Sequence, residues 1–341
     1  ILKSSRLTPT HLNPTGMIKV GIAGGASEAA GEVIRILTSH PDVELMWIYE
    51  PELEGTPVAD LHRGLRGDIY MRFTDKPAVD DADVIFLCYS TPEESGSFIE
   101  AFEVPGSMRL IDFSDRFIAD AFASHPSPDA AAKPGEWVYG LPELMRKPLV
   151  RGATRAVVPS PIASAITIGL LPLAKAGMLT SPLTIAATVS AAEGAAGETV
   201  ALIDHEALDH CALALGTLLP EGASTAPDTR IIITSGGWQR GITATAFFPS
   251  PAPLAEIATI YNDFFDDHNF TFVIDELPVI ADVAGTNKTL IHLDEVNGMT
   301  TVTVVFDDTL KGSAGNAVHL MNLIFGLQER VGLTLKASPG A

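Results

Sequence analysis

A glycine-rich stretch at residues 21–31 has the clearest chemical potential in the sequence. It follows an apolar run that begins at Met17 and predicts a buried strand, and it leads into a segment with helical spacing. A glycine turn at that place offers backbone N–H groups at a helix N-terminus, where the pyrophosphate of a dinucleotide binds. The match to G-x-G-x-x-G is imperfect, so a glycine turn without a ligand is the alternative. The residues expected to contact a dinucleotide are Gly21, Gly24, Gly25, Ala26 and Ser27.

Glu50 closes the next apolar run, residues 43–50. An acidic side chain at the end of this strand typically accepts hydrogen bonds from the adenosine ribose and repels a 2′-phosphate. We therefore expect NAD(H) to be favoured over NADP(H); the alternative is that Glu50 is a solvated loop carboxylate. Ser90, which ends the third apolar run at residues 81–90, is expected to add a cofactor contact.

The cysteines and histidines are few. Cys88 and Cys211 cannot make a disulfide scaffold, and no cysteine or histidine spacing matches a zinc site, so we predict no metal. His205 and His210 lie in one helical segment, and an imidazole titrates near neutral pH, so either is a candidate acid or base. Five residues apart, they do not share a helical face, and the alternative is that both are surface residues.

Apolar periodicity predicts the elements that position these residues. In the first half, buried strands alternate with helical segments such as residues 27–40, which indicates βαβ units and a parallel sheet. In the second half, strand-like runs follow one another with few helices between them, which favours a mixed or antiparallel sheet. These runs are residues 182–190, 229–236, 241–248, 289–296 and 299–308. The last strong helical pattern covers residues 313–332 and ends at Gly332.

The expected fold class is α/β, with a Rossmann-like dinucleotide-binding domain and an α+β substrate and oligomerisation domain built on a mixed sheet. We place the first domain at residues 17–159 and the second at residues 160–311. The terminal helix, residues 312–333, is expected to pack back on the first domain. Residues 1–16 are polar, lack the apolar core of a signal peptide and are interpreted as an N-terminal extension.

Composition narrows the class of protein. The chain has 341 residues, of which 22 are basic and 42 acidic, giving a formal net charge of −20. Its hydrophobic share of 46% suits a globular protein with more than one core. An acidic surface repels nucleic acid and anionic lipid, and no uninterrupted apolar run reaches membrane-spanning length. We expect a cytoplasmic protein that acts on a small molecule and binds neither nucleic acid nor membrane.

Several motifs in a fixed order give the chain a family resemblance. The motifs are the opening strand, loop and helix, then LHRGLRG (61–67), IDFSDRF (111–117), VYGLPEL (138–144), LLPLAKAGML (170–179), QRGITATAF (239–247), DVAGTN (282–287), DDTLKGSAGNAV (307–318) and MNLIFGL (321–327). With these motifs the chain resembles N-acetyl-γ-glutamyl-phosphate reductases, members of the semialdehyde dehydrogenase superfamily, from Met17 to about Leu333.

The resemblance implies reduction of an acyl phosphate to an aldehyde. In that family a cysteine thiolate forms a thioester, the nicotinamide cofactor supplies a hydride, and a histidine acts as acid and base. The stretch that matches the family's Asn-Pro-Gly-Cys-Tyr motif is residues 158–162, with Pro161 at the place of the cysteine. Proline has no nucleophilic atom, and neither Cys88 nor Cys211 aligns there. Ser160 beside it would form an ester, a poorer hydride acceptor than a thioester; its alternative role is a turn former or helix N-cap.

The resemblance also carries over other site residues. The candidates for catalysis are Ser160, Glu193, His210 and Lys311, and those placed at the cofactor or substrate are Gly312, Arg240 and Pro161. Where the family has basic residues, this chain has Gly197 and Glu198, which argues against a phosphorylated substrate bound in the family manner. A homodimer or homotetramer built through the second-domain sheet is implied as well.

Three hypotheses follow for function. The first is an oxidoreductase that transfers a hydride between NAD(P)(H) and a small carbonyl, alcohol or imine without a thioester, which requires only an oriented cofactor and an acid or base. The second is a non-catalytic homologue that acts as a binding or partner protein. The third is a lyase or isomerase that uses the same pocket without net redox change.

Overall fold

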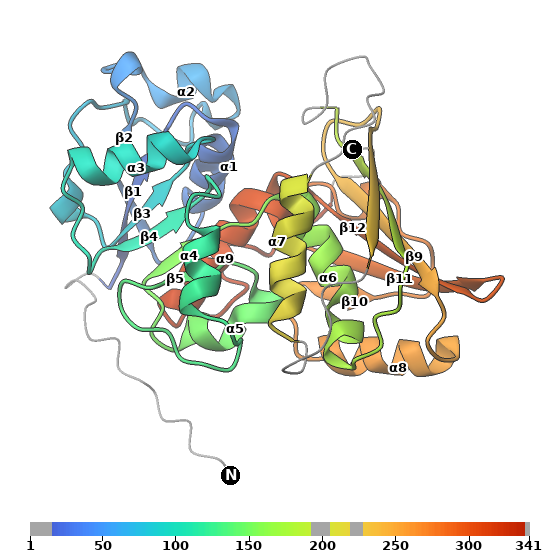
Figure 1. Ribbon diagram of the computed structural model, residues 1–341. Coiled ribbons are helices and arrows are strands. Elements are labelled where there is room, and N and C mark those ends of the chain that lie inside the picture. The colour runs from blue at the N-terminus through green and yellow to red at the C-terminus, as the bar shows by residue number, and fades with distance from the viewer. Residues whose placement is uncertain (1–15, 192–204, 219–227, 338–341) are drawn as a thin grey trace, which may run out of the picture.

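The computed structural model describes residues 16–191, 205–218 and 228–337 (Figure 1). This part of the chain forms two domains, each built on a six-stranded sheet. The first sheet is parallel and the second is mixed, so the predicted α/β class with two kinds of sheet is confirmed. Within the described ranges, no helix is both long and apolar enough to cross a membrane.

The first sheet has the strand order β2-β1-β3-β4-β6-β5, and every neighbouring pair is parallel. Its strands are β1 (Ile18–Ala23), β2 (Val43–Tyr49), β3 (Val84–Leu87), β4 (Arg109–Asp112), β5 (Trp137–Tyr139) and β6 (Arg155–Val157). Strand β3 is buried along its whole length, as expected of a parallel strand covered on both faces.

Helices and short turns connect these strands. The helices are α1 (Glu28–Leu37), α2 (Val58–Leu61), α3 (Pro92–Ala101), α4 (Ile118–Ser124) and α5 (Pro142–Val150), and the 3-10 turns are Pro51–Leu53, Arg63–Leu65 and Val79–Asp81. Helix α1 begins after Ser27, whose hydroxyl accepts the N–H of Ala30 at 3.1 Å. Val33, Ile34 and Leu37 are buried, as the helical spacing predicted.

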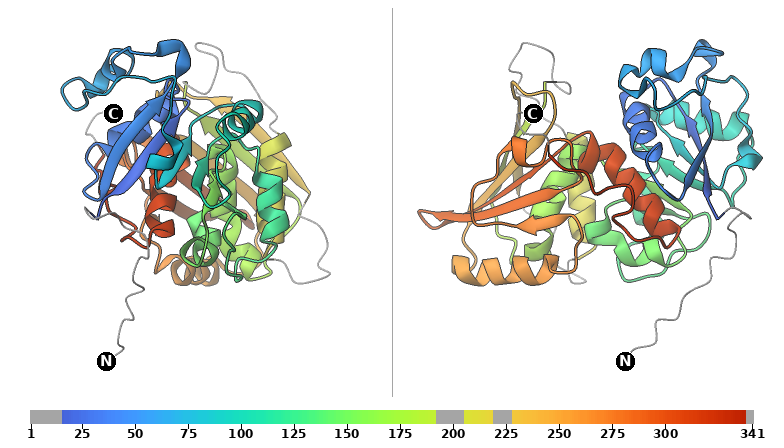
Figure 2. Two further views of the ribbon diagram at one scale, coloured as in Figure 1. Left: turned by 90° about the vertical axis from the view of Figure 1, so that its left-hand side faces the viewer. Right: turned by 180° about the vertical axis from the view of Figure 1, so that it is seen from behind.

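The second sheet has the order β10-β11-β12-β9-β7-β8. Its elements are α6 (Pro161–Lys175), β7 (Leu183–Val189), α7 (His205–Gly216), β8 (Thr229–Ser235), β9 (Ile242–Pro249), α8 (Leu254–Phe265), β10 (Thr271–Val273), a 3-10 turn (Ile280–Asp282), β11 (Thr289–Val296) and β12 (Met299–Phe306). Helix α6 packs on β7, β9 and β12, and α7 packs on α6 (Figures 1 and 2).

A wide helical turn joins the two domains. The π-helix Leu310–Ala314 follows β12 and contacts both α1 and α6. It continues directly into α9 (Gly315–Ile324), which contacts α1, α5 and β4 of the first domain. Helix α9 ends eight residues before the predicted Gly332, because Gly326 adopts a left-handed φ of 68° and its N–H caps the carbonyl of Leu323.

Candidate functional site

The glycine loop between β1 and α1 requires glycine for steric reasons. Gly24 has φ +74°, and a Cβ there would lie 2.9 Å from the carbonyl oxygen of Cys88. A Cβ on Gly25 would lie 2.5 Å from Cγ2 of Ile48. The backbone therefore passes close to β2 and β3, and this leaves the loop amides at the N-terminus of α1, where an anion is stabilised.

Glu50 contacts this loop directly. Its Oε2 accepts the backbone N–H of Ala26 at 3.1 Å in an exposed hydrogen bond. Ser27 caps α1, and Ser90 is exposed immediately before Thr91, the N-cap of α3. The N–H groups of Gly25, Ala26 and Ser27 donate within the chain, to Tyr49, Glu50 and Gly24. The Glu50 carboxylate beside the loop is the kind of acceptor that the ribose of a dinucleotide requires.

Ser160 and Pro161 begin α6. The Ser160 hydroxyl accepts the N–H of Ala163 at 3.3 Å, which makes Ser160 the helix N-cap. Pro161 occupies the first helical position, where its missing N–H costs no hydrogen bond. Its side chain faces the π-helix, since a Cβ on Gly312 would lie 2.9 Å from Cβ of Pro161. The structure thus brings Ser160, Pro161 and Gly312 together.

Both cysteines are buried away from that helix start. Burial raises the pKa of the Cys88 thiol, which follows β3 in the first domain. Cys211 lies on α7, where burial raises its pKa to about 12, although a hydrogen bond with Thr167 opposes the shift. Thr167 is six residues beyond Pro161, or about 9 Å along the helix axis at ~1.5 Å per residue. A protonated thiol is a poor nucleophile.

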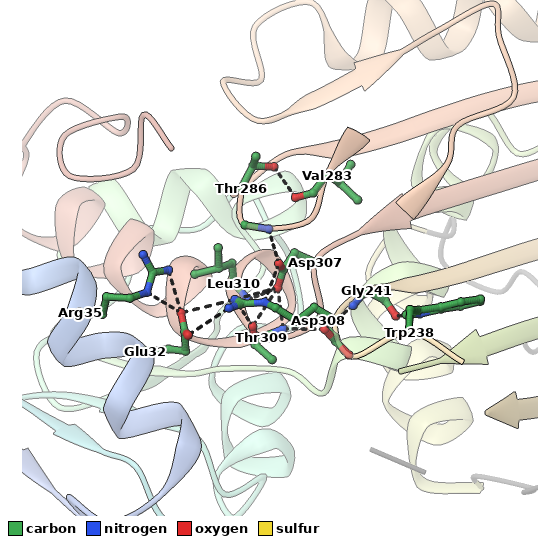
Figure 3. Close-up of polar contacts among 12 residues, drawn as sticks. Glu32, Arg35, Trp238, Gly241, Val283, Thr286, Asp307, Asp308, Thr309 and Leu310 are labelled. Atoms are coloured by element: carbon green, nitrogen blue, oxygen red, sulfur yellow. Dashed lines mark hydrogen bonds and ion pairs between the residues drawn. The ribbon is translucent and has the colours of Figure 1, made fainter. Parts of the chain in front are cut away.

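Arg240 is held between the carboxylates of Glu32 and Asp307, both of which are labelled in Figure 3. Its Nε lies 3.0 Å from Oδ2 of Asp307, and its Nη1 lies 3.1 Å from Oε1 of Glu32 on α1. Its guanidinium also contacts the hydroxyl of Thr309. Burial alone would lower the pKa of Arg240, but Asp307 and Glu32 raise it above the ordinary value. Arg240 therefore connects the β8–β9 turn to the first domain and is already paired without a substrate.

Lys311 is also paired, and it is buried. Its ammonium lies 2.7 Å from Oε1 of Glu143 on α5, and the side chains of both residues are at most 2% exposed. The same carboxylate oxygen accepts the hydroxyl of Thr271 at 2.8 Å. Burial alone would raise the pKa of Glu143, but the Lys311 charge holds it at about 2. This buried pair ties α5 to the π-helix.

The proposed acid and base residues are only partly described. His210 lies half-buried on α7, the helix that packs on α6. Glu193, Gly197 and Glu198 lie outside the described residues. His205 begins α7. Among the described ranges, no cluster of three histidine, cysteine or acidic side chains is arranged to hold a metal ion.

Sequence reasoning missed two residues of this region. Asp307 is fully buried and accepts hydrogen bonds from the N–H groups of Gly285 at 2.6 Å and Leu310 at 2.9 Å, besides Arg240. His62 lies 2.7 Å from the carbonyl oxygen of Gly25 through its Nε2. Both belong to motifs that carried the family resemblance, but nothing in their local sequence signals these contacts.

The chain is similar in sequence and in fold to known proteins. A family model described as "Semialdehyde dehydrogenase, NAD binding domain" matches residues 19–151. Among solved structures, aspartate semialdehyde dehydrogenase II from Vibrio cholerae, complexed with ASA, has a TM-score of 0.66 at 13% identity, covering 90% of this chain and 98% of that one. Aspartate semialdehyde dehydrogenase with NADP from Candida albicans has a TM-score of 0.63 at 14% identity, covering 92% and 99%.

These findings define a protein with the semialdehyde dehydrogenase fold, in which residues 19–151 match the model of the NAD-binding domain. N-acetyl-γ-glutamyl-phosphate reductase of Parabacteroides distasonis is 36% identical over 334 residues, covering 94% of this chain and 99% of the relative. The same reductase of Bacteroides thetaiotaomicron is 33% identical with the same coverage. The chain belongs to the N-acetyl-γ-glutamyl-phosphate reductase family, as its motifs indicated.

The buried pair gives a first testable prediction. Lys311→Met leaves the Glu143 carboxylate buried without its cation, so the free energy of unfolding should fall by about 3–5 kcal/mol. Adding Glu143→Gln should recover part of the loss. Lys147→Met, which removes the exposed pair with Asp129, is the matched control and should cost about 0–1 kcal/mol. Chemical denaturation measures all four proteins, and equal effects of the two lysine variants would contradict the structural role of Lys311.

The Lys311–Glu143 pair should also limit the stability of the protein at low pH. Because the pKa of Glu143 is lowered in the folded state to about 2, its contribution is complete above the ordinary carboxyl pKa of about 4.3. The contribution should be lost as the pH falls from about 5 toward about 2. Denaturation curves across that range should therefore show a steeper loss of stability in the unaltered protein than in Lys311→Met.

The N-cap gives a further prediction. Ser160→Ala should lower the free energy of unfolding by about 1 kcal/mol, because the N–H of Ala163 loses its acceptor. Ser160→Asp keeps a capping oxygen but no hydroxyl, and it should retain most of the stability. Thermal denaturation compares the stability of the variants with that of the unaltered protein. Thr91→Ala, which removes the N-cap of α3, is the control. An unchanged stability of Ser160→Ala would refute the capping role.

Proposed function

We propose that this protein transfers a hydride between NAD(H) and a small carbonyl, alcohol or imine without forming a covalent thioester. The observation that carries the proposal is the start of α6. Position 161, which the resemblance aligns with the family's cysteine, is a proline fitted to the first helical turn beside Ser160. The two thiols of the chain are buried and have raised pKa values, so neither supports a thiolate at neutral pH.

The cofactor half of the proposal is supported by the loop. Gly24, Gly25, Ala26 and Ser27 would line the pyrophosphate at the N-terminus of α1, and Glu50 would accept from the ribose hydroxyls. In the free protein the N–H groups of Gly25, Ala26 and Ser27 donate to Tyr49, Glu50 and Gly24. When bound, the nicotinamide ring donates or accepts the hydride. Gly312 packs directly against Pro161, so the π-helix lies beside the first turn of α6.

We assign the proton transfer of this reaction to residues of the second domain. When a carbonyl carbon accepts a hydride, its oxygen gains negative charge and takes a proton from a nearby acid; oxidation of an alcohol reverses both transfers. We assign this acid and base role to His210 or Glu193. Arg240 and Lys311 are assigned to positioning, because each is already neutralised by carboxylates. With both cations engaged, a neutral substrate suits the site better than an acyl phosphate.

The same pairing favours a second candidate, a non-catalytic homologue that binds a dinucleotide. Glu32 and Asp307 occupy the guanidinium that would otherwise clamp an anionic substrate. A protein of this kind would bind NAD(H) and transfer no hydride to any small carbonyl.

The reaction is tested by following NADH absorbance with small aldehydes, ketones and imines and, separately, with N-acetyl-γ-glutamyl phosphate. We expect turnover of at least one compound of the first group and none of the acyl phosphate. Iodoacetamide should leave the rate unchanged, because the pKa of Cys211 is raised to about 12. Reduction of the acyl phosphate would refute the proposal, and binding without any turnover would favour the non-catalytic homologue.

Cofactor choice is tested by fluorescence titration. We expect NAD(H) to bind more tightly than NADP(H), because the Glu50 carboxylate repels a 2′-phosphate. Glu50→Ala should weaken NAD(H) binding by about tenfold, the order expected for hydrogen bonds to a charged group. Glu44→Ala, at an exposed position near the start of β2, is the control and should change little. Tighter binding of NADP(H) to the unaltered protein would overturn the role of Glu50.

The second sheet supports an oligomer. Helices α6 and α7 lie over one face, whereas side chains on the other face, such as Ile232 on β8 (56% exposed) and Phe247 on β9 (36% exposed), are open to solvent. We therefore extend the proposal to a homodimer or homotetramer in which a second copy covers this face, as the family resemblance implies.

A further inference from the structure

His62 lies against the glycine loop from a separate segment of the first domain. It joins α2 to the 3-10 turn Arg63–Leu65, and its Nε2 lies 2.7 Å from the carbonyl oxygen of Gly25. A carbonyl oxygen only accepts hydrogen bonds, so Nε2 carries the proton and donates it. Val58 and Leu65 on either side are buried, which fixes the segment and therefore the ring.

The ring fits a notch in α1 that only glycine leaves open. A Cβ on Gly31 would lie 2.5 Å from Nδ1 and 2.9 Å from Cε1 of His62. Glycine inside a helix is destabilising relative to alanine, so Gly31 needs a reason, and the imidazole supplies it. The His62 ring also lies beside the buried Phe73, with 6.3 Å between the ring centroids. The His62 ring is therefore held by contacts with α1, with the carbonyl of Gly25 and with the Phe73 ring.

The hydrogen bond from His62 continues through a single peptide unit. The carbonyl of Gly25 and the N–H of Ala26 belong to the same peptide, and that N–H donates to Oε2 of Glu50 at 3.1 Å. Hydrogen bonds in such a chain polarise one another, so a donor on the carbonyl makes the Ala26 N–H a stronger donor. The imidazole also fixes the plane of the peptide and hence the direction of the N–H.

We propose that His62 is a positioning residue that orients and polarises the Gly25–Ala26 peptide, whose N–H holds the Glu50 carboxylate in place for the dinucleotide. The inference rests on the proposed function for its ligand, but the hydrogen-bond chain exists in the free protein. Gly31 is the partner that makes room for the ring. The pair therefore gives each of the two residues a role in binding that neither the glycine pattern nor the family motif assigns.

The first test compares His62→Ala, His62→Gln and the control Tyr70→Ala, whose position in the same region is 89% exposed. His62→Ala should raise the Kd for NADH by roughly five- to tenfold, the loss expected for one hydrogen bond to a binding group. His62→Gln keeps an N–H donor and should restore binding to within about twofold. Tyr70→Ala should bind like the unaltered protein. An unchanged Kd in His62→Ala would overturn the proposal.

A second measurement needs no cofactor. Amide hydrogen exchange at Ala26 in the free protein should speed up several-fold in His62→Ala, and it should not change in Tyr70→Ala. If the unaltered protein binds no dinucleotide but this exchange changes as expected, the proposed function fails while the role of His62 in holding the peptide stands. If exchange does not change, the role of His62 fails whatever the protein binds.

A double-mutant cycle tests the notch. Gly31→Ala should displace the ring and weaken NADH binding about as much as His62→Ala does. In the His62→Ala background the added methyl group meets no ring, so Gly31→Ala should cause no further loss and should raise the melting temperature, because alanine favours the helix. Additive losses in the double variant would show that Gly31 and His62 act independently and would overturn this part of the inference.

Discussion

The buried carboxylate of Asp307 is the constraint on which the arrangement of the two domains depends. Its oxygens accept from the N–H groups of Gly285 and Leu310 and from the guanidinium of Arg240, which in turn reaches Glu32 on α1. One charge thus fixes the loop before β11, the π-helix, the β8–β9 turn and the orientation of the first domain (Figure 3). Removing it would leave several buried donors unsatisfied, which is more costly than losing the bonds themselves.

The interior of the site reflects the acidic composition. Arg240 is held by two carboxylates, Lys311 by Glu143, and Arg146 by Glu329, so the chain itself neutralises these three cations. With a net charge of −20, the chain has more carboxylates than cations, so carboxylates are available to pair with each of them. Because these cations are already paired with carboxylates, they are not free to bind an anionic substrate. This pairing is the electrostatic reason for expecting a neutral substrate.

Local features of the sequence predicted the fold well. Contacts between residues far apart in the sequence could not be predicted from it. The apolar runs located the parallel strands because such strands are buried on both faces, and the glycine loop was found because Gly24 needs a positive φ. The partner of Lys311 lies 168 residues earlier, and Glu32 lies 208 residues before Arg240, so no spacing rule signals either pair. Helix α9 was predicted too long because an apolar pattern continues past Gly326, where the backbone already turns.

The π-helix lies between the two halves of the site. It contacts α1, whose N-terminus carries the dinucleotide loop, and α6, whose first turn carries Ser160 and Pro161, and Gly312 packs directly on that proline. A close-packed wedge transmits displacement, because there is no void to absorb it. We expect a ligand that shifts one helix to affect the other through this packing, and thermodynamic linkage would make that influence equal in both directions. Cofactor and substrate affinities should accordingly be linked rather than independent.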